Sequence, residues 1–366
     1  MIKKLQLVFL LAVSILLAGC SSFGPAMNAS PSAIHAMGFA TISVEDIEEK
    51  YTNEDSQWLA YKGMRIHYRD TGKKDGEAIV LLHGIMSSLH TWDDWTKELE
   101  KDYRVIRLDL PGFGLTGPLP EDIKYDTGNF IAFLNTFSHK MELEQFALAG
   151  NSLGGYISAH YASEFPDRVT KLILLDPIAY PQDVPWVIKM ANAPVVWHMS
   201  KKVVPPWLVS KNVEEVYGDK SRIEERHMKR YLELSMRKGN RASYAEVLRL
   251  IYEKSKPGQE VFPFNQITAP TLLMWGEKDK WVPKSQIPNW ERDIKTTQTI
   301  VYPGVGHVPM EELPKQTVKD AIKFLKTESP ESIKTAAQSE ASPDTGETPE
   351  QPPATASDSA LVPTEA

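Results

Sequence analysis

Ser152 has sequence neighbours that indicate covalent chemistry. It lies in the hexapeptide GNSLGG at positions 150–155, directly after the apolar run Phe146–Ala149. This pattern is typical of a buried strand that turns sharply into a helix, with glycines where neighbouring chains pass close to the turn. Such a turn exposes the serine hydroxyl at the N-terminus of a helix, whose dipole favours developing negative charge. The sequence therefore predicts that Ser152 is a nucleophile.

A nucleophilic serine needs a base that takes its proton and a carboxylate that orients the base. Two apolar runs downstream of Ser152 lead to residues of these types. Thr271–Gly276 is followed closely by Asp279, and Thr299–Tyr302 leads to His307. Both runs are typical of buried strands, and α/β sheets bind ligands at the loops that follow their strands. We therefore expect Asp279 to be the acid and His307 to be the base.

An apolar run upstream of the serine indicates where the oxyanion is held. Ala78–Leu82 is followed by the sequence HGIM at 83–86. A loop of this kind supplies one backbone N–H to a tetrahedral oxyanion, and the residue after the nucleophile supplies another. We expect these donors to be the N–H of Ile85, with Met86 as the alternative, and the N–H of Leu153. Each such donor is worth ~3–4 kcal/mol in the transition state. His83 is expected to orient the loop.

Four motifs in this order make the chain similar to the α/β-hydrolase superfamily. They are HGIM at 83–86, DLPGFG at 109–114, GNSLGG at 150–155 and the Asp279–His307 pair. The resemblance extends from Trp58 to Lys326 and implies a mostly parallel, eight-stranded sheet with helices on both faces and a helical cap inserted after the sixth strand. Within the superfamily the chain most resembles the cap-bearing serine lipases and esterases. The dehalogenase and epoxide hydrolase branches use an aspartate nucleophile, so Ser152 argues against both.

The acid of the triad has two alternatives in the sequence. Glu277 lies two residues before Asp279, and Asp176 follows the apolar run Lys171–Leu175. Some members of the superfamily carry the acid after that earlier strand, so Asp176 stays open beside the preferred Asp279. Asp109, in the DLPGFG motif, is expected to close a loop near the site through hydrogen bonds.

The N-terminus has the pattern of a secretory signal. Two lysines precede the apolar run Leu5–Leu17, which ends at small residues before Cys20. The run is shorter than the ~20 residues that an ordinary spanning helix needs. Its end resembles a bacterial lipobox, which implies that residues 1–19 are removed and that Cys20, the only cysteine of the chain, carries lipid. We expect a protein anchored in the bacterial cell envelope, and Ser21 favours the outer membrane over the inner one.

Composition divides the rest of the chain. Residues 20–57 are predicted to be a membrane-tether spacer with a short helix over Thr41–Tyr51. Residues 58–179 and 264–326 are predicted to form the hydrolase core, and residues 180–263 are predicted to form the cap. Residues 327–366 form an acidic tail, which from Glu328 on contains eight acidic residues and one basic residue, Lys334. Because this tail is rich in Pro, Ser, Thr and Ala and poor in large apolar residues, it is predicted to be disordered. No protein partner is predicted.

The cap sequence favours contact with something apolar. Its first half contains two tryptophans among prolines and valines, and we expect Trp197 and Trp207 to contact the substrate. Two interpretations stay open. The apolar residues face a lipophilic acyl chain or lipid, or they serve to dock the cap on the core. Large ligand sites are mostly apolar with a few fixed polar groups, which fits the first interpretation.

The predicted reaction is hydrolysis of a carboxylic ester, with a small-molecule or lipid ester as substrate. The first alternative is carbon–carbon bond hydrolysis on the same fold, which Asn151 favours, because the members that cleave such bonds carry a similar GNS sequence. The second alternative is a non-catalytic binding protein. The chain has no CxxC, HExxH or P-loop pattern, so the sequence implies neither a metal nor another cofactor. It also has no basic surface pattern for nucleic acid.

Overall fold

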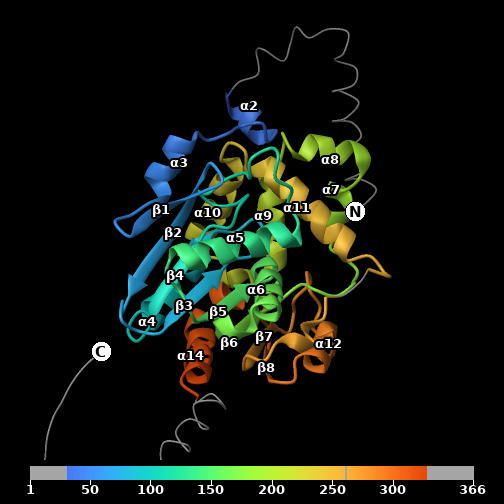
Figure 1. The fold of residues 1–366 in the computed structure, drawn as a ribbon. Helices are drawn as coiled ribbons and strands as arrows, with labels where there is room; N and C mark the ends of the chain where they lie inside the picture. The colour runs from blue at the N-terminus through green and yellow to red at the C-terminus, as the bar shows by residue number, and fades with distance from the viewer. Residues whose placement is uncertain (1–30, 260–261, 328–366) are drawn as a thin grey trace, which may run out of the picture. The chain divides into compact units, whose positions relative to one another are not determined.

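The computed structural model describes residues 31–259 and 262–327, and it is built on one eight-stranded sheet (Figure 1). The strands are β1 (Ser56–Tyr61), β2 (Met64–Gly72), β3 (Ala78–Leu82), β4 (Arg104–Leu108), β5 (Phe146–Asn151), β6 (Val169–Leu175), β7 (Thr271–Gly276) and β8 (Thr297–Tyr302). Their order is β1-β2-β4-β3-β5-β6-β7-β8. β2 pairs antiparallel with β1 and β4, and the other pairs are parallel. The predicted fold class is confirmed.

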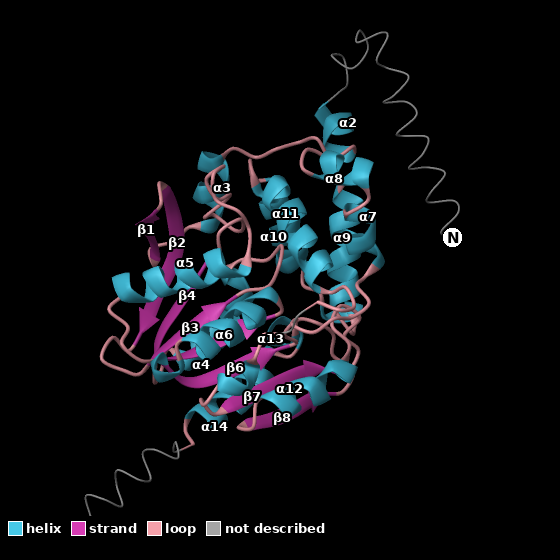
Figure 2. Ribbon diagram, turned by 45° about the vertical axis from the view of Figure 1, so that its right-hand side comes forward, coloured by secondary structure: helices cyan, strands magenta, loops and turns pink. Residues whose placement is uncertain are grey.

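Helices cover both faces of this sheet (Figure 2). They are α4 (Asp93–Leu99), α5 (Thr127–Lys140), α6 (Leu153–Glu164), α12 (Ile287–Asp293), α13 (Pro309–Glu312) and α14 (Pro314–Leu325). Alternate residues of the central strands enter two separate apolar clusters: Val80 and Leu82 pack with α5 and α6, whereas Ile79 and Leu81 pack with α4 and α14. Because both faces are buried, β3 and β5 are continuous apolar runs in the sequence.

The cap lies between β6 and β7, as predicted. The described residues of the cap form the α-helices α7 (Trp186–Ala191), α8 (Pro194–Ser200), α9 (Pro206–Val216), α10 (Glu225–Met236) and α11 (Asn240–Lys254). Proline opens α8 and α9 at the first helical position, where its missing N–H leaves no hydrogen bond unmade. None of the helices in the described part of the chain is long and apolar enough to span a bilayer.

The segment before β1 is folded against the cap. It contains α2 (Pro31–Ala36) and α3 (Val44–Tyr51), whose Ile47 is fully buried. Ile42 exchanges backbone hydrogen bonds with α10, accepting from Lys238 and donating to Met236. Part of the predicted spacer therefore belongs to the folded body, because its apolar residues find partners on the cap. The predicted signal peptide, Cys20 and the tail from residue 328 lie outside the described residues.

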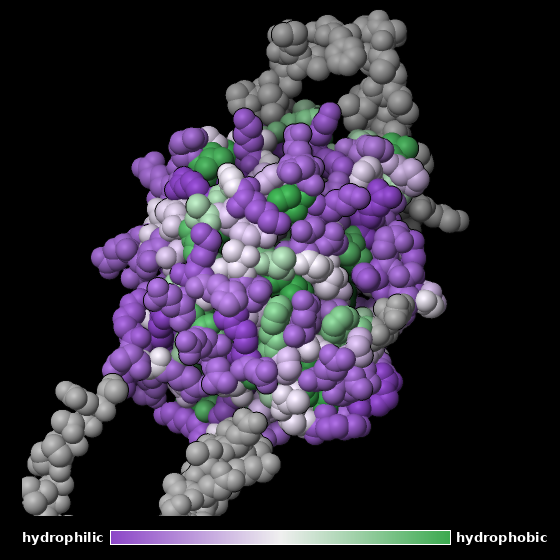
Figure 3. Space-filling model, in the orientation of Figure 1, coloured by the Kyte–Doolittle hydropathy of each residue, from purple (hydrophilic) through white to green (hydrophobic). Residues whose placement is uncertain are grey.

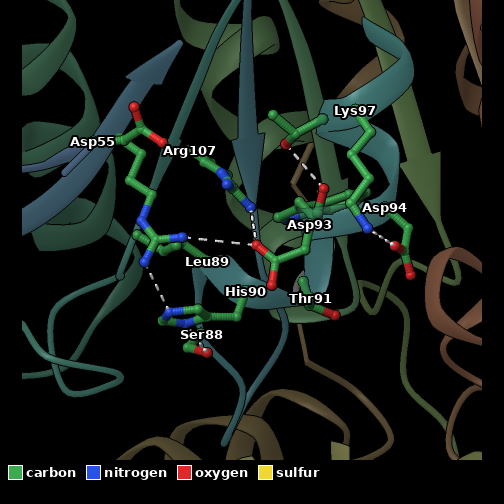
Figure 4. Close-up of polar contacts among 12 residues, drawn as sticks. Asp55, Ser88, Leu89, His90, Thr91, Asp93, Asp94, Lys97 and Arg107 are labelled. Carbon is green, nitrogen blue, oxygen red and sulfur yellow. Dashed lines mark hydrogen bonds and ion pairs between the residues drawn. The ribbon is translucent and has the colours of Figure 1, made fainter. Parts of the chain in front are cut away.

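A buried group of charges joins the start of α4 to the antiparallel part of the sheet (Figure 4). The Arg107 guanidinium donates to the Asp93 carboxylate, and Arg69 lies 3.8 Å from the same carboxylate. Arg69 also donates to the Tyr51 carbonyl, at the end of α3. Burial alone would raise the pKa of Asp93, but Arg107 holds it below its usual value. This ion group therefore stays charged at neutral pH and ties α3 to the core.

Candidate active site

Ser152 occupies a strained turn between β5 and α6. Its backbone angles are φ 52° and ψ −112°, a conformation that costs a residue with a side chain of the order of 1–3 kcal/mol. The positions around Ser152 need glycine because the backbone of neighbouring segments leaves no room for a Cβ atom. A Cβ on Gly150 would lie 2.3 Å from the Gly154 carbonyl oxygen, and one on Gly154 would lie 2.2 Å from that of Leu82. The predicted strand–turn–helix geometry is therefore present, and it holds the hydroxyl at the start of α6.

Asp279 and His307 are hydrogen-bonded in the structure. His307 Nδ1 lies 2.7 Å from Asp279 Oδ2, and Asp279 Oδ1 accepts from the N–H groups of Trp281 and Val282. Among the described residues, no group bonds to His307 Nε2, although the side chain is buried. His307 and Ser152 line the same pocket. The carboxylate thus orients the imidazole, and the second ring nitrogen is free to act as a base.

Asn151 fixes the loop that carries His307. Its side-chain amide donates to the carbonyls of Leu175 and His307, at 3.1 and 3.0 Å. The His307 N–H in turn donates to the Val216 carbonyl of the cap at 2.7 Å. The residue before the nucleophile therefore has a structural use that does not depend on a particular substrate.

Asp176 lies beside the acid and not in its place. It is fully buried, with φ 45°, and its Oδ1 accepts from the Gly276 N–H at 2.9 Å. Burial raises the pKa of Asp176 well above its usual value, and the neighbouring charge of Asp279 raises it further. Only Asp279 bonds directly to His307. Glu277, the other alternative, is exposed and accepts from the Gly304 N–H and Lys284.

Asp176, Asp279 and His307 are also the only described residues whose grouping could hold a metal ion, with ligand atoms within 4.8 Å of one another. The hydrogen bonds of these three residues explain why they lie close together without a metal ion. His307 already bonds to Asp279, and a neutral Asp176 is a poor metal ligand because a carboxyl group must lose its proton to ligate. The donor set therefore fits a proton relay better than a metal centre.

The loop after β3 presents backbone donors to the pocket. His83 fixes this loop, since its Nε2 accepts from the Leu110 N–H at 3.0 Å and its Nδ1 donates to the Gly84 carbonyl at 2.7 Å. Burial lowers the pKa of His83, so the ring is neutral and keeps this tautomer. Within the described residues the Ile85 N–H makes no hydrogen bond. Leu153 is the first residue of α6, where N–H groups have no partner inside the helix.

The pocket lies under the cap helix α9, but neither predicted cap residue lines it. Its lining residues are Gly84, Ile85, Met86, Ser87, Asn151, Ser152, Val209, Asn212, Val213, Val216, Tyr231, Trp281, His307 and Val308. Trp207 is 52% exposed, and Trp197 lies against the cations of Lys201 and Arg249. The prediction for these two residues is corrected: α9 contacts the site through smaller residues. In the sequence, the three- and four-residue spacing of the α9 valines could have identified these lining residues, because residues so spaced lie on one face of a helix.

A hydrogen-bonded series of Ser, His and Asp lies elsewhere among the described residues. Ser56 Oγ is 3.0 Å from His67 Nε2, and His67 Nδ1 is 2.8 Å from Asp109 Oδ2. Asp109 also accepts from the N–H groups of Leu89 and Leu115, which confirms its predicted role in closing a loop. None of Ser56, His67 and Asp109 lines the pocket of Ser152. This contact is therefore structural, and it offers a matched control for Ser152.

Two neighbouring glutamates hold the cap on the loop of His307. Glu311 is buried and bonds to Arg230 and Tyr217 of the cap and to Thr91 of the core. Glu312 accepts from the N–H groups of Gly218 and Gly306, at 2.9 and 2.8 Å. Burial alone would raise the pKa of Glu311, but Arg230 holds it below its usual value. The cap and the catalytic loop are therefore joined by buried, charged hydrogen bonds.

The chain is similar to known hydrolases. The chain is 26% identical over 264 residues to the uncharacterized hydrolase YugF of Bacillus subtilis, covering 71% of this chain and 93% of that protein. It is 25% identical over 253 residues to a 2-hydroxy-6-oxo-2,4-heptadienoate hydrolase of Pseudomonas putida, covering 67% of this chain and 87% of that protein.

Among solved structures, a bacterial membrane phospholipase A superposes with a TM-score of 0.60 and 26% identity, covering 88% of this chain and 98% of that one. A family model described as the alpha/beta hydrolase fold matches residues 77–314. Because this match spans well over half of the sequence, the chain belongs to the α/β-hydrolase fold family.

Proposed function

We propose that the protein is a carboxylester hydrolase with Ser152 as nucleophile, His307 as base and Asp279 as the acid that orients it. The observation that carries the proposal is the unpartnered Nε2 of His307, a residue that lines the same pocket as Ser152. A free imidazole nitrogen beside a serine at the start of a helix is the arrangement that acyl transfer needs. Valines, an isoleucine, a methionine and a tryptophan are among the residues that line the pocket, and these suit a lipophilic acyl chain.

The reaction proceeds in two proton-balanced halves. His307 Nε2 takes the Ser152 proton while Oγ attacks the ester carbonyl, and the N–H groups of Ile85 and Leu153 hold the oxyanion. The intermediate collapses to an acyl-enzyme and expels the alcohol, which receives the proton from His307. Water then attacks the acyl-enzyme, and His307 takes its proton and returns it to Ser152 Oγ.

Carbon–carbon bond hydrolysis is the second candidate, and the similarity to the P. putida dienoate hydrolase supports it. Such a substrate carries a carboxylate, whose burial is costly without a cation. No lysine or arginine is among the residues that line the pocket of Ser152. Asn151, which favours this alternative in the sequence, donates its side-chain amide to backbone carbonyls. We therefore rank ester hydrolysis first.

The proposal includes a membrane anchor at lipidated Cys20 in the bacterial envelope, with the outer membrane preferred. Four large apolar side chains are exposed on the N-terminal segment and the neighbouring cap helices: Met37, Phe39, Val195 and Trp207. In Figure 3 the face shown is mostly hydrophilic, with small apolar areas scattered over it, and some of these lie at its upper end, where α2 and α8 lie in Figure 1. A lipid surface near the tether would cover these side chains.

The anchor is tested by expressing the full chain and a Cys20→Ser variant in a bacterium fed an alkyne analogue of palmitate. We expect the analogue to label the wild type and not the variant. We also expect the wild type, but not the variant, in the membrane fraction. Equal membrane recovery of both proteins without label would contradict lipidation.

The reaction is tested with p-nitrophenyl esters from acetate to palmitate and with 2-hydroxy-6-oxohepta-2,4-dienoate. We expect the purified full-length protein to hydrolyse the esters, Ser56→Ala to stay within about threefold, and Ser152→Ala to lose about 1,000-fold or more. Faster turnover of the dienoate than of every ester would favour the second candidate. Turnover of no substrate would favour a binding protein.

A further inference from the structure

The cap helix α9 faces the pocket with one polar side chain among apolar ones. Val209, Asn212, Val213 and Val216 line the pocket, and their three- and four-residue spacing puts them on one face of the helix. The three valines need no hydrogen bond. Asn212 lies between them and carries an amide into a wall that is otherwise hydrocarbon.

The Asn212 side chain is buried and unsatisfied within the protein. The residue is 8% exposed, and no described residue bonds to its Oδ1. Two other buried asparagines in the described part of the chain make side-chain hydrogen bonds. Asn151 donates to two backbone carbonyls, and Asn240 both donates to the carbonyls of Gly114 and Leu234 and accepts from Arg237. A buried acceptor without a partner is destabilising, so Asn212 is matched to something that enters the pocket.

A complementary donor faces the same pocket from the core. Trp281 lies on the loop that carries Asp279, is 7% exposed, and its indole N–H has no partner among the described residues. The pocket therefore presents an unpaired acceptor on the cap and an unpaired donor on the core. A hydroxyl group donates and accepts at once without charge, so it suits both kinds of partner. No Asp, Glu, Lys or Arg is among the lining residues, which argues against a phosphate or a carboxylate.

We propose that Asn212 is a specificity-determining residue that binds a hydroxyl group of the substrate, so that the substrates are esters with a hydroxyl near the scissile bond. The inference rests on the proposed ester hydrolysis. We assign the hydroxyl to the alcohol portion, as in an ester of a polyol. A hydroxyl on the acyl portion would satisfy the same atoms, and the two sources are separated by experiment.

The test compares matched pairs of esters with the purified full-length protein in a pH-stat. 2-Hydroxyethyl butyrate is paired with propyl butyrate, and ethyl 3-hydroxybutyrate with ethyl 3-methylbutyrate. We expect wild type to prefer 2-hydroxyethyl butyrate over propyl butyrate by about tenfold or more in kcat/KM. Asn212→Leu should lose about 10- to 100-fold on the hydroxylated ester and stay within about threefold on its partner. Lys211→Ala, on the exposed face of α9, is the control that should change neither.

Each outcome decides the inference. A preference confined to the 3-hydroxybutyrate pair would support the hydroxyl site and overturn its assignment to the alcohol portion. Equal turnover within both pairs by wild type would overturn the inference and leave the proposed function standing. An equal loss on both members of a pair in Asn212→Leu would also overturn it. If wild type hydrolyses the p-nitrophenyl esters but none of these four esters, the inference fails and the proposed function stands. If it hydrolyses no ester of either set, both fail.

Discussion

The Asp176 carboxyl group lies within 4.8 Å of both the Asp279 carboxylate and the His307 ring, yet only Asp279 bonds to His307. The two aspartates follow neighbouring parallel strands, β6 and β7, so their side chains meet at one edge of the sheet. Two buried carboxyl groups this close cannot both be ionised cheaply. Burial and the charge of Asp279 raise the pKa of Asp176, whereas Asp279 is the carboxyl group that bonds to the imidazole.

The first prediction follows from this division of roles. Asp279→Asn removes the charge that holds the His307 tautomer, and we expect kcat to fall about 1,000- to 10,000-fold. Asp176→Asn replaces a neutral carboxyl group with a neutral amide, and kcat should stay within about tenfold. Both variants are measured on p-nitrophenyl butyrate at pH 7.5. A larger loss in Asp176→Asn than in Asp279→Asn would exchange the two assignments.

The second prediction concerns the space at the nucleophile turn. A Cβ on Gly154 would lie 2.2 Å from the Leu82 carbonyl oxygen, which is backbone and cannot move alone. Gly154→Ala should therefore lose most activity and unfold at a lower temperature. Gly128, near the start of α5, has only an ordinary 3.6 Å contact at the same position. Gly128→Ala should keep full activity and gain up to about 1 kcal/mol in stability. Equal effects of both substitutions would contradict the packing argument.

The third prediction concerns the charged connection between the cap and the His307 loop. Glu311→Gln leaves the Arg230 guanidinium buried without its counter-charge, and we expect a loss of about 3–5 kcal/mol in the free energy of unfolding. The double variant Glu311→Gln with Arg230→Met removes both charges and should recover much of that loss. Urea unfolding followed by tryptophan fluorescence measures the cycle. Additive losses in the double variant would show that the two charges act independently.

The fourth prediction is a pH dependence of stability. His160 is buried against Tyr156 and Phe262, and burial lowers its pKa to about 3, with Lys254 adding to the shift. The unfolded chain binds a proton near pH 6.5 and the folded chain does not, so stability is lost as the pH falls below about 6.5.

His160→Phe removes this titration. We expect the wild type to lose about 2 kcal/mol more than the variant between pH 7 and pH 5. The free energy of unfolding in urea at the two pH values gives the comparison. Equal losses in both proteins would show that His160 does not titrate as the burial requires.

The sequence placed Ser152, Asp279 and His307 on three loops that follow strands, and the fold brings these loops to one pocket. This much was predictable because parallel strands end at one edge of a sheet. The sequence predicted that the cap is a helical insertion, but it did not predict which cap residues contact the pocket. Trp197 and Trp207 suggested substrate contact by their size, but the direction of a side chain on a cap helix depends on how the helix docks.

Asn212 and Glu311 have roles in the structure that the sequence did not predict. The sequence around Asn212, an asparagine between valines on an amphipathic helix, does not indicate that this residue is buried and lines the pocket of Ser152. Glu311 resembles a surface residue near the start of a helix, and only the folded chain brings Arg230, 81 residues away, against it. Long-range polar contacts of this kind have no local pattern, so they were not predicted.

The central claim is that Ser152 forms an acyl-enzyme. The most direct measurement is to mix the full-length protein with p-nitrophenyl acetate, quench with acid within the first turnovers, and map the digested protein by mass spectrometry. The account predicts one acetyl group on the peptide that contains Ser152, and none on that peptide in Ser152→Ala or on the peptide that contains Ser56. Ester turnover with no acetyl group on Ser152, or with acetyl on another residue, would contradict it.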